Sequence, residues 1–142
     1  MSQVSESFAK GCAEIRAALT AFPAASGNTP YRPGGWTRKQ VLGHMIDSAA
    51  NNHQRFIRLQ SGDLANFPPY DPDIWVERGA YAENSWTSVV TLWHLYNVQL
   101  VHIITGIPAE VLTNRWVDQN VDLAFLVHDY VDHMVGHLKE VA

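Results

Sequence analysis

A chain of 142 residues can enclose one sizeable hydrophobic core but not two, so we expect a single domain spanning residues 1–142. Hydrophobic residues make up 46% of the chain and charged residues 17%, a composition that argues against intrinsic disorder. The net charge of -4 and the scattered positions of the ten Lys and Arg residues argue against a nucleic-acid partner, because phosphate binding requires clustered basic side chains.

The first predicted helix spans residues 4–22. Its apolar residues recur at spacings of three and four, the period of an amphipathic helix. They are Val4, Phe8, Cys12, Ile15, Leu19 and Phe22. Pro23 ends the helix, and a loop rich in Gly and Pro follows it. Charged residues are spaced through this segment, so we expect no secretory signal.

The second predicted helix, residues 38–60, has a well-marked start. Thr37 and Gln40 have the spacing of a capping box, in which each residue bonds the backbone of the other. Trp36 and Val41 stand on either side of this cap as a hydrophobic staple. These paired features predict that the helix begins at Arg38.

Residues 61–83 are predicted to form a long crossover loop, with room for a helical turn. The segment contains three prolines and two glycines and has no sustained periodicity. It also holds Phe67, Tyr70, Trp75 and Tyr81, which is too aromatic for a flexible linker. We therefore expect this loop to pack over the rest of the chain.

Two more helices complete the predicted fold. The third begins near residue 84 or 85 and ends at Thr105, where Gly106 stops it. The fourth begins after Asp122, a suitable N-cap, with Val121 and Leu126 as its staple, and runs to the C-terminus. Four helices without strand-like alternation predict an all-α four-helix bundle, with the long crossover loop between helices two and three.

The sequence also bears on cellular location. No segment approaches 18 consecutive apolar residues, so no membrane span is expected. Cys12 is the only cysteine, so an intrachain disulfide cannot form. These features are compatible with a reducing compartment, and we expect a cytoplasmic protein.

His133 and His137 stand four residues apart in the fourth predicted helix. This spacing places both imidazoles on one helical face, where they can reach the same ion. The two histidines flank the predicted buried face, a position that suits a metal at the mouth of a cleft. An HxxxH pair alone is weak evidence, and a site would need a third ligand from elsewhere.

The best third ligand is His44, in the second turn of the second predicted helix. It shares a helical face with Ser48, Asn51 and Arg55. This face is either a solvated polar surface, which periodicity alone slightly favours, or the lining of a cleft between helices. In a cleft, Asp47, Ser48 or Asn51 could orient the imidazoles.

The sequence resembles DinB-like proteins over roughly residues 36–140. The family's second-helix motif is similar to the segment WTRKQVLGHMIDSAANNHQRF. In that motif a metal-binding His comes about eight residues after a Trp-Ser/Thr start, and an Asp comes three residues after the His. The family's closing HxxxH motif is similar to the segment HDYVDHMVGHLKE. The family's aromatic character is also present in two segments between these motifs, FPPYDPDIWVERGAY and SWTSVVTLWHLYN. Gly136 stands where close relatives often carry another His, at a position that is not a ligand in the pattern.

The resemblance implies a three-histidine site formed by His44, His133 and His137. The resemblance implies Zn²⁺, Ni²⁺ or a similar ion at this site. Because bundles of this family are often dimeric, it also implies a homodimer. Asp129 could accept the N–H of His133, although an exposed charge is an equally good interpretation. Tyr70, Trp75 and Tyr81 form either a lid over the metal or an aromatic cluster that packs for stability.

Three histidines leave at least one position of a divalent ion open to water, a thiolate or substrate. Known activities among DinB-like proteins include thiol S-transfer, in which a low-molecular-weight thiol is activated at the metal. Other members are called metal-dependent hydrolases, largely because their sites are similar. We therefore expect a metal-dependent enzyme acting on a small molecule, with thiol S-transfer ahead of hydrolysis. Because no convincing general acid or base stands out, the alternative is a non-catalytic metal-binding or stress-related ligand-binding bundle.

Overall fold

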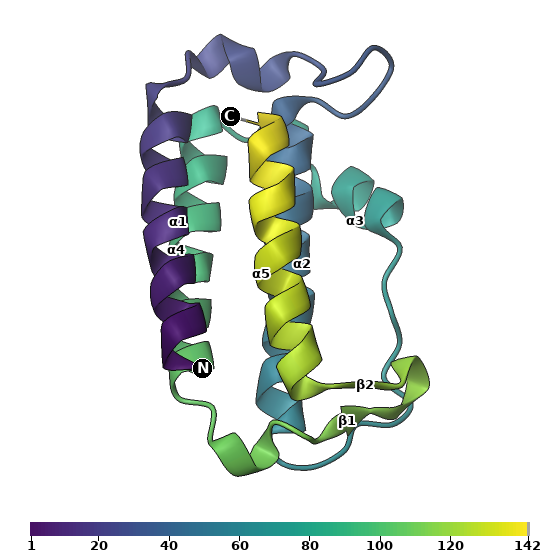
Figure 1. Ribbon diagram of the computed structural model, residues 1–142. Helices are drawn as coiled ribbons and strands as arrows, with labels where there is room; N and C mark the ends of the chain where they lie inside the picture. Colours follow the sequence, from purple (N-terminus) through teal and green to yellow (C-terminus); the bar gives the residue numbers. More distant parts are fainter. Residues whose placement is uncertain (142) are drawn as a thin grey trace.

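The computed structural model describes residues 1–141, except for the side chains of 139 and 140. Four long helices form a bundle, which confirms the predicted fold (Figure 1). They are α1 (Ser2–Ala21), α2 (Arg38–Leu59), α4 (Trp86–Thr105) and α5 (Leu123–Val141). Helix α1 lies beside α4, and α5 lies beside α2. Of the described helices, none combines the length and hydrophobicity required to cross a bilayer.

The helix starts follow the predicted caps. Thr37 Oγ1 accepts a hydrogen bond from the backbone N–H of Gln40 at 3.2 Å, and Gln40 Oε1 accepts one from the N–H of Thr37 at 3.0 Å. Asp122 Oδ1 accepts a hydrogen bond from the N–H of Phe125 at 2.8 Å. These bonds satisfy backbone donors that a helix start otherwise leaves unpaired.

The crossover between α2 and α4 is long because both helices run in the same direction. The chain leaves one end of the bundle after α2 and must return along its side before α4 can start at the other end (Figure 1). The crossover contains a complete helix, α3 (Pro72–Gly79), followed by the 3₁₀ turn η2 (Tyr81–Glu83). Asp71 caps α3 and Pro72 stands at its first position, a local combination that favours a helix start.

A small sheet precedes α5, where no strand was predicted. Strand β1 (Arg115–Trp116) pairs antiparallel with β2 (Val121–Asp122), and the 3₁₀ turn η4 (Val117–Gln119) joins them. The strands are too short for alternation to be visible in sequence. Leu64 of the crossover bonds to both Arg115 and Val117 through its backbone, so tertiary contacts hold this region in place. Two further 3₁₀ turns, η1 (Ala24–Asn28) and η3 (Ala109–Val111), lie in the remaining connections.

Cys12 lies in the core between the helices and is only 3% exposed. Burial raises the pKa of its thiol to about 12, since the thiolate would be poorly solvated there. We therefore expect an aromatic disulfide reagent to leave the native protein unmodified at mildly alkaline pH and to label one thiol per chain in urea. Rapid labelling of the native protein would contradict this packing.

Candidate metal centre

The structure brings together His44 from α2 and His133 and His137 from α5. One ring nitrogen of each lies within 4.8 Å of those of the other two. The ring centroid of His44 is 5.7 Å from that of His133 and 5.1 Å from that of His137, and the last two are 4.3 Å apart. His44 is buried, His137 is partly buried and His133 is exposed, so the cluster extends from the interior to the surface.

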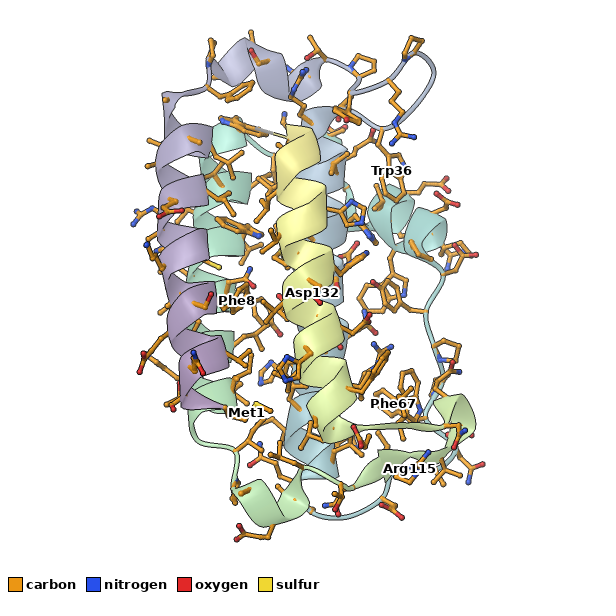
Figure 2. The ribbon with its side chains drawn as sticks, in the orientation of Figure 1. Met1, Phe8, Trp36, Phe67, Arg115 and Asp132 are labelled. Carbon is orange, nitrogen blue, oxygen red and sulfur yellow. The ribbon has the colours of Figure 1, made fainter. Side chains whose placement is uncertain are left out.

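Local structure explains how these rings meet. His133 and His137 are one turn apart on α5, and their Nε2 atoms approach to 2.8 Å. His44 follows the capped start of α2, and the ring of Trp36 packs against it with a centroid distance of 5.2 Å. Figure 2 shows Trp36 beside the first turns of α2. The capping box at Thr37 and Gln40 thus positions both Trp36, which precedes it, and His44, which follows it.

The donor set fits a divalent transition metal. Imidazole nitrogens suit zinc, nickel, copper and iron, with bond lengths of about 2.0–2.1 Å for zinc. Nitrogens on one tetrahedral ion would then be roughly 3.4 Å apart. The separations in the cluster fall within 4.8 Å, so modest side-chain rotation accommodates an ion. Three protein ligands would leave a position open, as in catalytic sites.

The polar face of α2 is buried, so its interpretation as a solvated surface is wrong. His44 is 6% exposed, Ser48 3% and Arg55 7%. Helix α5 and the crossover both pack against α2. This face therefore lines the space between helices.

A cavity of about 290 Å³ lies beside His133. It is bounded by α2, α5, the crossover and the small sheet. The lining residues are Ser48, Asn52, Arg55, Tyr70, Trp116, Gln119, Val121, Phe125, Leu126, Asp129, Tyr130 and His133. Of the pocket residues predicted from sequence, Ser48, Tyr70 and Asp129 belong to this wall.

The other predicted pocket residues, Asp47, Asn51 and Trp75, do not line this cavity. Trp75 is 41% exposed and is not part of the wall, although its ring packs on that of Tyr70 at 5.4 Å. The side chain of Asn51 donates to the backbone carbonyl of Asp47. Asp47 is buried and accepts a 2.5 Å hydrogen bond from Tyr81. Burial raises the pKa of Asp47, and the bond from Tyr81 partly opposes that rise.

Sequence reasoning did not select Arg55, Asn52 or Trp116 as site residues. Arg55 follows His44 by eleven residues and Ser48 by seven, so helical spacing placed it on the right face. Trp116 had no such pattern, because it reaches the cavity through β1. Its indole N–H bonds to the carbonyl of Phe67 at 3.1 Å, which ties the crossover to the sheet. Figure 2 shows Phe67 beside the two short strands, near Arg115.

A second hollow of about 310 Å³ reaches the histidine cluster at His137. Its other lining residues are Tyr31, Arg32, Gly35, Trp36 and Val41, from the connection between α1 and α2 and from the start of α2. The cluster therefore borders two hollows, one at His133 and one at His137.

Comparisons with known proteins agree with this architecture. The chain is 35% identical over 65 residues to "Putative metal-dependent hydrolase YfiT" of Bacillus subtilis, a match covering 46% of this chain and 36% of that protein. It is 29% identical over 118 residues to a Bacillus pumilus protein with the name "Putative metal-dependent hydrolase", covering 80% of this chain and 67% of that one.

The fold is similar to that of the solved structure of YfiT, with a TM-score of 0.76 and 22% identity. The alignment covers 96% of this chain and 85% of that one. That structure is described as "a probable metal-dependent hydrolase with an unusual four-helix bundle topology". At this identity the likeness concerns the fold. The model of the DinB superfamily matches residues 8–141, and the chain therefore belongs to the DinB superfamily.

Proposed function

We propose that this chain is a metal-dependent enzyme acting on a small molecule, with one divalent ion, Zn²⁺ or Ni²⁺, held by His44, His133 and His137. The observation that carries the proposal is the convergence of three imidazoles beside a cavity of about 290 Å³, which His133 lines. The two Bacillus relatives, each named "Putative metal-dependent hydrolase", support the same class of chemistry.

The bound ion would supply Lewis acidity and lower the pKa of a water or thiol at its open position. Asp129 lines the cavity one turn before His133, where its carboxylate can accept a proton from the attacking group. The hydroxyls of Ser48 and Tyr70 lie in the same wall and can orient polar atoms of the substrate. Burial of His44 limits the access of bulk water to one side of the site.

Thiol S-transfer is the second candidate reaction. Its specific support is the second hollow at His137, because transfer needs room for both a thiol and its acceptor, whereas hydrolysis needs only one organic substrate. A homodimer and a cytoplasmic location remain predictions. The non-catalytic alternative predicts metal binding without turnover.

The test compares zinc-loaded and nickel-loaded protein on two sets of compounds: chromogenic esters and phosphates, and low-molecular-weight thiols with an aryl halide. We expect turnover in one set and a loss of at least ~100-fold in kcat for Asp129→Asn, with metal content unchanged. Asp132→Asn is the matched control. Asp132 lies on the same helix (Figure 2), is exposed, and is not one of the residues that line the cavity. Metal-loaded protein without turnover in either set would favour the non-catalytic bundle.

A further inference from the structure

Arg55 is a buried cation that faces the cavity beside His133. Its side chain is only 7% exposed and forms part of the cavity wall. Among the side chains that the structure describes, no carboxylate forms an ion pair with Arg55, and its Nε has no hydrogen-bond partner. A buried charge is normally paired, because removal from water is costly. Arg55 therefore lacks the partner that its burial calls for.

The contacts of Arg55 orient its guanidinium group without neutralising it. The group lies over the ring of Trp116 at 4.3 Å and near that of Tyr70 at 6.0 Å. Within the described part of the chain, its one hydrogen bond runs from Nη1 to Asn52 Oδ1 and is long at 3.4 Å. Burial lowers the pKa of Arg55, an effect that Tyr70 partly opposes, but arginine stays protonated at neutral pH. The contact with the Trp116 ring helps to orient the guanidinium group and its remaining N–H groups.

The other charge on the cavity wall does not fill this role. Asp129 is exposed at the cavity edge, where water can solvate its carboxylate. No ion pair joins it to Arg55. Apart from Arg55, Asp129 and His133, the wall consists of uncharged side chains, among them the apolar side chains of Val121 and Leu126. The cavity thus combines a buried cation with apolar surface.

We propose that this cavity binds the carboxylate of a small organic substrate through Arg55, with the apolar body of the substrate against Val121 and Leu126. Arginine is suited to this role because its planar N–H groups match the two oxygens of a carboxylate. Binding of a carboxylate by Arg55 does not depend on the proposed function, but a role for that binding in catalysis does. In the proposed enzyme, the anchored carboxylate would hold the rest of the substrate near the three histidines. Arg55 is on this view a substrate-binding residue that selects anionic molecules.

The test uses metal-free, full-length protein and the probe benzoate, with benzamide as the neutral analogue of the same shape. Binding is followed by NMR through the ¹⁵Nε–H signals of the arginine side chains. We expect benzoate to shift the Arg55 signal saturably and benzamide to leave it in place. Arg55→Met keeps much of the apolar stem and should weaken benzoate binding by ~10-fold or more, the effect of losing a charge-assisted hydrogen bond.

Arg58→Met is the matched control, because Arg58 is exposed one turn later on α2 and its Nε already donates to Gln54 Oε1. It should bind benzoate as the native protein does. Equal shifts with benzoate and benzamide would overturn the inference even if Arg55→Met failed to fold. So would benzoate binding that needs zinc and survives Arg55→Met, because the carboxylate would then bind the metal. Benzoate binding at Arg55 in a protein that never retains zinc would support the inference while the proposed function failed.

Discussion

His44→Ala is expected to abolish stoichiometric metal binding. His44 is the buried member of the cluster and the only one from α2, so its loss leaves two ligands on one turn of α5. Changes to groups that merely orient a ligand cost metal sites ~10- to 100-fold in affinity, so removing a ligand should cost more than ~100-fold. Elemental analysis of untagged protein, with a competition titration for zinc and nickel, measures the effect. The native protein should retain about one equivalent of ion.

His128→Ala supplies the control for this measurement. His128 is exposed on α5, five residues before His133, and is not part of the cluster. Its replacement should leave the metal content unchanged. His137→Ala should resemble His44→Ala, because both remove one of three ligands. A native protein that takes up neither ion after incubation would contradict the metal centre and, with it, the proposed enzyme.

Gly43→Ala should destabilise the fold, although alanine is the better helix former. A Cβ atom at position 43 would lie 2.2 Å from Cδ2 of Tyr81, so the ring would have to move. That ring is buried against α2, and the hydroxyl of Tyr81 donates the hydrogen bond to Asp47. Overpacking costs roughly 1–3 kcal/mol, and the lost bond adds about 1 kcal/mol. Since alanine recovers about 1 kcal/mol of helix propensity, we expect a net loss of ~2 kcal/mol in the free energy of unfolding, measured in urea.

Gly11→Ala is the matched control. Gly11 lies within α1, and a Cβ there would meet nothing within 4 Å. This variant should gain ~0.5–1 kcal/mol from helix propensity. The clash is tested further in a Tyr81→Ala background, where Gly43→Ala should no longer destabilise the protein. An equal loss in both backgrounds would show that the close approach of Tyr81 is not the cause.

The helices of the bundle could be read from sequence because their determinants are local. The sequence predicts the capping box at Thr37 and Gln40 and the cap at Asp122, and both are formed in the structure. The crossover was predicted as a long aromatic loop, but α3 within it was not identified as a full helix. With only eight residues, α3 gives little periodic pattern to detect. The two short strands also have no periodic pattern in the sequence. Backbone hydrogen bonds to Leu64, which is distant in sequence, hold this region in place.

For the site, the sequence by itself determined that His133 and His137 share one face of a helix, because a spacing of four residues fixes that geometry. It also placed His44, Ser48 and Arg55 on one face of α2. Only the tertiary structure decided that this face is buried rather than solvated, because burial depends on which helices pack against it. The packing of α5, the crossover and β1 around α2 brings Trp116 to Arg55 and the three imidazoles to one point.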